Sequence, residues 1–93
     1  MEFTWNESKA SANLKKHGVS FEEAVTVFNN PLAVIFDDEV HSIGEQREII
    51  IGHSRKSRLI LVAFIERSNT IRIISARLAT RREREDYEQG NQP

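Results

Sequence analysis

The chain has 93 residues, contains no cysteine and carries a formal net charge of -1. This length suits one small domain with a single core and leaves no room for a second, and the lack of cysteine excludes a disulfide framework and a thiolate zinc site. The chain shows neither a signal-peptide layout nor an apolar run of membrane-spanning length, so we expect a cytoplasmic protein with no membrane contact.

Two helices are predicted in the first third of the chain. Residues 3–5 indicate a short strand or an apolar lead-in. The first helix is predicted over residues 7–17, because Asn6 is a suitable cap and Gly18 occupies the position of a left-handed C-terminal residue. Residues 20–23 form a capping box, which predicts the start of the second helix.

The periodicity then changes from helix to strand. Four strands are predicted, over residues 32–36, 47–52, 59–65 and 71–77, and a capping box at residues 80–83 predicts a C-terminal helix. We therefore predict an α+β fold in which the two N-terminal helices pack on one face of a four-stranded antiparallel sheet, leaving the other face for function. The domain is expected to span residues 1–90, followed by a disordered tail of residues 91–93.

Basic residues gather in one part of the chain. Residues 47–84 contain ten lysines and arginines against three acidic residues, a net of +7, and the segments on both sides are acidic. A local field of this kind can attract a polyanion, although an ordinary solvated surface is the alternative. Strict alternation along the last strand puts Arg72 and Arg77 on opposite faces, so that only one of them can enter a given cleft.

The residue types disfavour metal and cofactor chemistry. The three histidines lie far apart in the sequence, and the carboxylates around His41 are typical of a solvated loop. Glycine-rich phosphate loops and nucleophile elbows are absent, so we expect no metal and no cofactor. Metal-free RNA cleavage is still possible, because RNA supplies its own nucleophile in the 2′-hydroxyl group.

Such a reaction needs cations around the phosphate, a base and an acid. Arg47, Arg77 and Arg81 are the candidates for phosphate binding, and we expect them to converge on one pocket. His17 can act as acid or base, or it can simply cap the first helix.

Other side chains offer alternatives for the same chemistry. Glu45 and Glu66 are alternative bases, each close in sequence to the basic strands. Tyr87 can stack on a base of the RNA or pack against the sheet.

Nearly the whole chain resembles one known family. The matching positions include Phe3-Thr4-Trp5-Asn6, His41-Ser42, Glu45-Gln46-Arg47 and two longer blocks over residues 16–24 and 72–77. These motifs resemble the BrnT toxins. Ser57 stands where that family often has a glycine.

The resemblance implies a RelE-like ribonuclease of a type II toxin-antitoxin system that inhibits translation. It also implies a ribbon-helix-helix antitoxin similar to BrnA, a 2:2 heterotetramer, and contact with operator DNA only through the antitoxin. The positions that match family motifs and bear useful chemistry are predicted as catalytic residues, His17, Glu45, Arg47, Glu66 and Arg77, and as RNA or phosphate ligands, Arg67, Arg81 and Tyr87.

Two alternative functions use the same basic surface. The first is a non-catalytic module that binds RNA or DNA. The second is a co-repressor subunit that only completes an antitoxin–operator complex.

Overall fold

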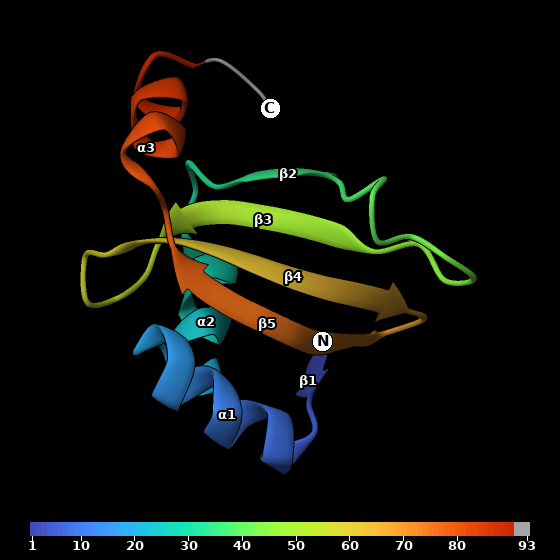
Figure 1. The fold of residues 1–93 in the computed structure, drawn as a ribbon. Coiled ribbons are helices and arrows are strands. Elements are labelled where there is room, and N and C mark those ends of the chain that lie inside the picture. The colour runs from blue at the N-terminus through green and yellow to red at the C-terminus, as the bar shows by residue number, and fades with distance from the viewer. Residues whose placement is uncertain (91–93) are drawn as a thin grey trace.

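The computed structural model describes residues 1–90 and has the predicted α+β class (Figure 1). The elements, in chain order, are β1 (Glu2–Thr4), α1 (Glu7–His17), α2 (Phe21–Thr26), the 3-10 helix η1 (Val27–Asn29), β2 (Val34–Asp37), β3 (Glu48–His53), β4 (Leu59–Arg67), β5 (Thr70–Leu78) and α3 (Arg81–Glu88). They form one sheet in the order β1-β5-β4-β3-β2. The predicted disordered tail lies outside the described residues.

The predicted four-stranded antiparallel sheet is wrong in one respect. Within residues 1–90 the sheet has five strands and is mixed, because β1 pairs parallel with β5. Phe3 lies opposite Ile71 in this pairing. A three-residue strand is too short to show a periodicity of its own, and its partner lies far along the chain.

Local capping signals place the helix ends as predicted. Asn6 Oδ1 accepts a hydrogen bond from Lys9 N at 3.0 Å, and Gly18 ends α1 with a φ of 68°. At α3, the Thr80 side chain and the Glu83 side chain cap each other's backbone N–H groups. Both helices therefore begin where a short polar side chain satisfies free backbone donors.

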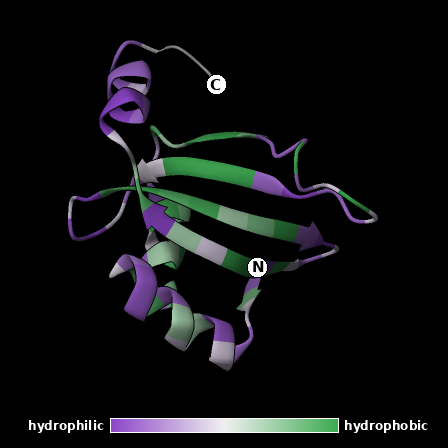
Figure 2. Ribbon diagram, in the orientation of Figure 1, coloured by the Kyte–Doolittle hydropathy of each residue, from purple (hydrophilic) through white to green (hydrophobic). Residues whose placement is uncertain are grey.

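The two helices α1 and α2 cover one face of the sheet, as predicted, and α3 lies on the opposite side (Figure 1). The main core forms between these helices and β3, β4 and β5, and it includes Phe21, Ile60, Val62 and Phe64. In Figure 2 the strands β3 and β4 are the hydrophobic centre of the sheet, whereas α3 is hydrophilic. On the other face, α3 packs against a smaller apolar cluster.

A β-bulge in β5 overturns the predicted alternation of its arginines. Ala63 pairs with Ser75, but the next residue of β4, Phe64, pairs with Ile73, so Ile74 is an extra residue. An extra residue shifts the alternation by one position. Arg72 and Arg77 therefore lie on the same face, the one that α1 and α2 leave uncovered.

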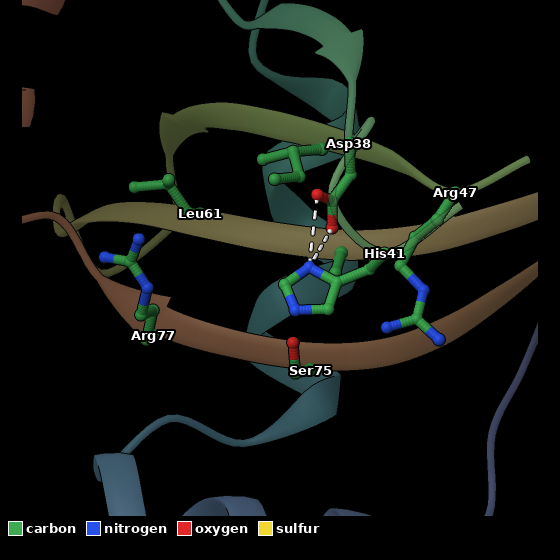
Figure 3. A pocket seen from close by; sticks show the side chains of 8 residues that line it. Asp38, His41, Arg47, Leu61, Ser75 and Arg77 are labelled. Atoms are coloured by element: carbon green, nitrogen blue, oxygen red, sulfur yellow. Dashed lines mark hydrogen bonds and ion pairs between the residues drawn. The ribbon is translucent and has the colours of Figure 1, made fainter. Parts of the chain in front are cut away.

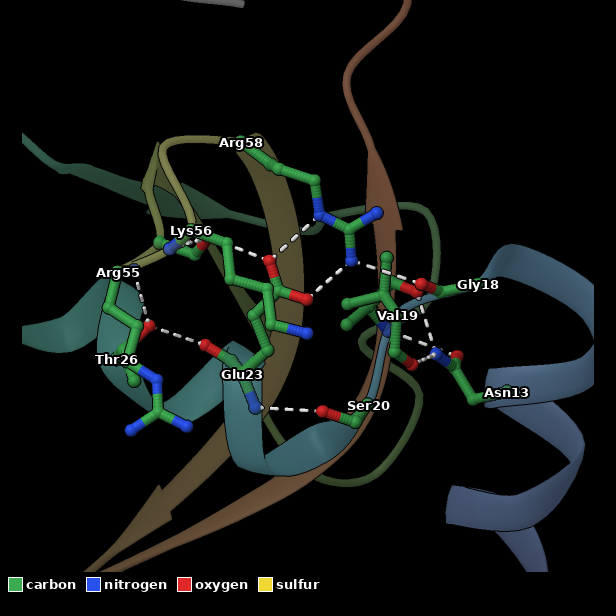
Figure 4. A network of polar contacts seen from close by, with 11 residues as sticks. Asn13, Gly18, Val19, Ser20, Glu23, Thr26, Arg55, Lys56 and Arg58 are labelled. Carbon is green, nitrogen blue, oxygen red and sulfur yellow. Dashed lines mark hydrogen bonds and ion pairs between the residues drawn. The ribbon is translucent and has the colours of Figure 1, made fainter.

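A polar network joins α2 to the turn between β3 and β4 (Figure 4). The buried Glu23 carboxylate accepts hydrogen bonds from Ser54 Oγ at 2.7 Å and from Arg58 Nε at 2.9 Å, and it forms an ion pair with Arg58 Nη2. Arg58 Nη2 also donates to the carbonyl of Gly18 at 3.0 Å. In the same turn Ser57 has a φ of 62°, a conformation that favours glycine.

Asn13 ties α1 to the sheet from a buried position. Its Nδ2 group donates to the carbonyls of Val19 at 2.9 Å and Ala76 at 2.8 Å, and its Oδ1 accepts from Ala76 N at 3.1 Å. Asn13 thus satisfies backbone groups of β5 where β1 no longer pairs with it. Across residues 1–90, helices of sufficient length and apolarity to cross a membrane are absent.

Candidate active site

A pocket of about 250 Å³ lies on the uncovered face of the sheet (Figure 3). Its lining comes from β3, β4, β5 and the loop between β2 and β3, and consists of Asp38, His41, Arg47, Ile49, Leu61, Ala63, Ser75 and Arg77. The apolar side chains belong to the sheet. The polar side chains therefore stand on and around an apolar floor.

The loop that carries His41 is closed by one hydroxyl group. Ser42 Oγ donates to the carbonyl of Asp38 at 2.6 Å and accepts from Arg47 N at 2.9 Å. The backbone also closes directly, since Asp38 N donates to the carbonyl of Arg47 at 2.8 Å. These bonds hold both ends of the loop together and place His41 over the sheet.

His41 is oriented by a carboxylate. Its Nδ1 lies 3.2 Å and 3.1 Å from the two carboxylate oxygens of Asp38. An ionised carboxylate can only accept, so Nδ1 is the donor, and in the neutral ring Nε2 keeps its lone pair. Figure 3 shows the imidazole between Arg47 and Arg77, with the Ser75 hydroxyl next to it. This arrangement suits a general base.

Arg77 is held rigidly by the first turn of α3. Its Nη1 and Nη2 groups donate to the two carboxylate oxygens of Glu83, each at 2.8 Å. These hydrogen bonds, together with the backbone N–H of Thr80, lower the pKa of Glu83 to about 2, and they raise the pKa of Arg77. Arg77 is therefore a preorganised donor whose charge is partly balanced.

Arg47 is different, because it has an unsatisfied donor. Its Nε atom is buried, and no hydrogen-bond acceptor for it exists among residues 1–90. A buried N–H without a partner is costly, and none of the ion pairs among residues 1–90 involves the Arg47 guanidinium. Arg47 is thus the cation in this pocket that is free to bind an anion.

The structure brings together some of the predicted site residues and separates the others. Arg47 and Arg77 meet in the pocket, and Glu45 and Arg67 line a neighbouring cleft on the same face. Arg81, expected to converge with them, is 94% exposed and pairs with Glu85.

The three other predicted site residues also lie outside the pocket. His17 lines a separate hollow beside α1. Glu66 pairs with the core residue Ile71, so it lies on the face that the helices cover. The hydroxyl of Tyr87 donates to the carbonyl of Leu32 at 2.7 Å, which favours packing over the stacking alternative.

Sequence reasoning missed Asp38, His41 and Ser75. The spacing of Asp38 and His41, three residues apart, was a usable signal, because it brings a carboxylate to an imidazole within one turn of chain. Ser75 was not distinguishable, since the bulge decides which face it occupies. In the part of the chain that the structure describes, no group of three or more histidines and carboxylates is arranged to hold a metal ion.

These features are those of an α+β protein that carries arginines and a carboxylate-held histidine on the open face of its sheet. Residues 5–83 match the model of the family "Ribonuclease toxin, BrnT, of type II toxin-antitoxin system". The chain belongs to this family.

A solved structure agrees with this assignment. The chain is similar to the ribonuclease toxin BrnT of Brucella abortus, known from a crystal structure, with 25% sequence identity and a TM-score of 0.67. The match covers 87% of this chain and 99% of that one. A comparison with curated protein sequences gives no significant match.

Proposed function

We propose that this chain is a metal-independent endoribonuclease that cleaves RNA by attack of the 2′-hydroxyl group and thereby inhibits translation in the cytoplasm. The observation that supports this most strongly is the pairing, in one pocket, of a carboxylate-held imidazole with an arginine that has no ion-pair partner among residues 1–90. The first group suits proton transfer, and the second suits a phosphate oxygen.

The proposed chemical step uses these two groups. His41 Nε2 takes the proton of the 2′-hydroxyl, and the 2′-oxygen attacks the adjacent phosphorus. The bond from phosphorus to the 5′-oxygen breaks, and the leaving oxygen takes up the proton that His41 acquired. The products are a 2′,3′-cyclic phosphate and a 5′-hydroxyl end.

The arginines act on the charge of the phosphate. Arg47 donates through the terminal N–H groups of its guanidinium to an oxygen of the phosphorane, where negative charge accumulates, and Arg77 supplies a second guanidinium in a position fixed by Glu83. The Ser75 hydroxyl lies beside the imidazole and can donate to the same group.

Membership of a type II toxin family implies an antitoxin partner. We propose a ribbon-helix-helix antitoxin similar to BrnA, whose dimer joins two copies of the toxin in a 2:2 heterotetramer. In that assembly the antitoxin contacts operator DNA, and the toxin is joined to the DNA only through the antitoxin.

The test is RNA cleavage by purified protein in the presence of EDTA. We expect Arg47→Ala and His41→Ala to lower the cleavage rate by about 10²-fold or more. The matched controls, Arg81→Ala and His17→Ala, change the same residue types outside the pocket and should retain wild-type rates. Wild-type cleavage by Arg47→Ala would refute the proposal, and salt-sensitive RNA binding without any product would favour the non-catalytic module.

A further inference from the structure

Beside the active-site pocket, on the same face of the sheet, we infer a second phosphate subsite formed by Arg67 and Arg72. It would take a phosphodiester of single-stranded RNA that flanks the cleaved one. Glu45 occupies the place of that anion when RNA is not bound. The inference rests on the proposed function, because it assigns the neighbouring part of the same RNA strand.

The subsite is a cleft of about 370 Å³. Its lining comes from β1, the β4–β5 hairpin and the loop between β2 and β3, and consists of Thr4, Glu45, Ile65, Arg67, Ser68, Thr70 and Arg72. Three of these residues carry hydroxyl groups, which donate readily to phosphate oxygens. The cleft therefore offers two guanidinium groups and several neutral donors.

Strand register places this cleft in line with the active-site pocket. Along β4 and β5, Leu61 pairs with Arg77, Ala63 with Ser75 and Ile65 with Arg72. Because cross-strand partners share a face, these side chains form one continuous row on the uncovered surface. The bulge at Ile74 is what brings Arg72 into this row.

The row has a length that suits a short stretch of RNA. The partners of Arg72 and Arg77 on β4, Ile65 and Leu61, are four residues apart, which corresponds to roughly 13 Å at the usual rise per residue. A few nucleotides of extended single strand span that distance. One strand can therefore place one phosphate in the active-site pocket and another in the cleft.

Each of the two sites combines one paired arginine with one unpaired arginine. In the active-site pocket Arg77 is paired and Arg47 is not. In the cleft Arg67 forms an ion pair with Glu45, whereas Arg72 is exposed and has no ion-pair partner among residues 1–90. The unpaired arginines, Arg47 and Arg72, are therefore the ones available to bind an anion.

The ion pair in the cleft is easily exchanged. The side chains of Arg67 and Glu45 are 74% and 51% exposed, so water and salt screen their attraction. The Glu45 carboxylate lies where a phosphate would bind. A phosphodiester can replace it on Arg67, because the phosphate oxygens also accept from Arg72 and from the hydroxyl groups of the cleft. Glu45 is accordingly a competitor of RNA in this cleft, and its assignment as a general base becomes the alternative outcome of the test.

The experiment compares Arg72→Ala, Glu45→Gln and the exposed control Arg84→Ala in the full chain. Binding of a short 2′-O-methyl RNA, which cannot be cleaved, is measured by fluorescence anisotropy over a range of salt. Arg72→Ala should weaken binding and lower the slope of log K against log salt by about 0.7, the value for one single-strand phosphate contact. Glu45→Gln should tighten binding.

Cleavage kinetics give an independent readout. With a longer RNA, Arg72→Ala should raise KM without changing kcat, and Glu45→Gln should lower KM. With a dinucleotide, which contains only the scissile phosphate, both variants should match wild type. Thermal unfolding checks that the variants remain folded.

Three results would overturn the subsite: unchanged RNA binding by Arg72→Ala, loss of kcat in Glu45→Gln, or an effect of these variants on antitoxin binding alone. The two proposals fail separately. If wild type binds the methylated RNA in the predicted way and cuts no RNA, the nuclease proposal fails and the subsite stands. If wild type cuts RNA and Arg72→Ala binds normally, only the subsite fails.

Discussion

Replacing Arg58 by methionine tests how the N-terminal helices are joined to the sheet. The Glu23 side chain is 2% exposed, and Arg58 supplies two of the three side-chain donors around its carboxylate. Methionine keeps much of the hydrophobic stem but removes those donors and the charge. Ser54 Oγ then remains as the side-chain donor to an otherwise uncompensated buried carboxylate.

The expected loss of unfolding free energy is large for a domain of this size. Removing one partner of a buried ion pair costs about 3–5 kcal/mol, and the lower end applies here because the Arg58 side chain is 34% exposed. The typical total for a domain is about 5–15 kcal/mol. For a domain of this length 1 kcal/mol corresponds to about 4–8 °C, so the melting temperature should fall by at least about 12 °C. Arg81→Met, at a fully solvated position, should change the unfolding free energy by no more than about 0.5 kcal/mol.

Urea unfolding at pH 7 and pH 5 measures this effect and its pH dependence. In wild type the hydrogen bonds from Arg58 lower the pKa of Glu23, so its contribution is present above the ordinary value of 4.5 and is lost as pH falls through the lowered value. In Arg58→Met, burial dominates and raises the pKa of Glu23. The free energy of unfolding of the variant should therefore rise from pH 7 to pH 5. The difference in unfolding free energy between the variant and wild type should become smaller.

A second substitution separates the charge from the packing. In Arg58→Met combined with Glu23→Gln the buried charge is gone, so most of the lost free energy should return. A loss below about 1 kcal/mol in the single variant, or identical pH dependence in the variant and wild type, would show that Arg58 does not compensate the buried charge of Glu23.

Three other substitutions test the remaining contacts. Glu83→Gln should flatten the acid unfolding profile, measured by circular dichroism, between pH 4.5 and about pH 2. The lowered pKa of Glu83 gives wild type a stabilising contribution that is lost as pH falls through that range. An unchanged profile would contradict the role of the ion pair with Arg77. Asn13→Leu should lower the unfolding free energy in urea by about 2 kcal/mol or more, since it leaves buried backbone groups of Ala76 unsatisfied; a neutral effect would mean that water replaces the amide. Tyr87→Phe should cost about 0.5–1.5 kcal/mol and leave RNA affinity unchanged, whereas a loss of RNA affinity would support base stacking.

The helices and the main strands could be predicted because their signals are local. Asn6, Gly18 and Thr80 cap helices through contacts within a few residues, and the structure confirms each of them. The bulge at Ile74 could not be predicted in this way. Isoleucine suits either face of a half-buried strand, so only pairing with β4 decides where the shift occurs.

The candidate site was predictable in part for the same reason. The basic character of residues 47–84 is a property of composition, and Arg47 and Arg77 do meet in one pocket. The roles of individual acids and histidines depend on tertiary contacts instead. His17 and His41 are equivalent in sequence terms, but only His41 has a carboxylate partner and a place in the pocket.

The most direct test of the central claim, that this pocket cuts RNA through the 2′-hydroxyl group, uses a single 2′-deoxy substitution. The cut position in a synthetic RNA is first mapped, and the nucleotide on its 5′ side is then replaced by its deoxy form. If the 2′-hydroxyl is the nucleophile, cleavage at that bond stops in EDTA-containing buffer, while mass spectrometry of the unmodified RNA finds 2′,3′-cyclic phosphate ends. Cleavage of the substituted bond at the original rate would contradict it.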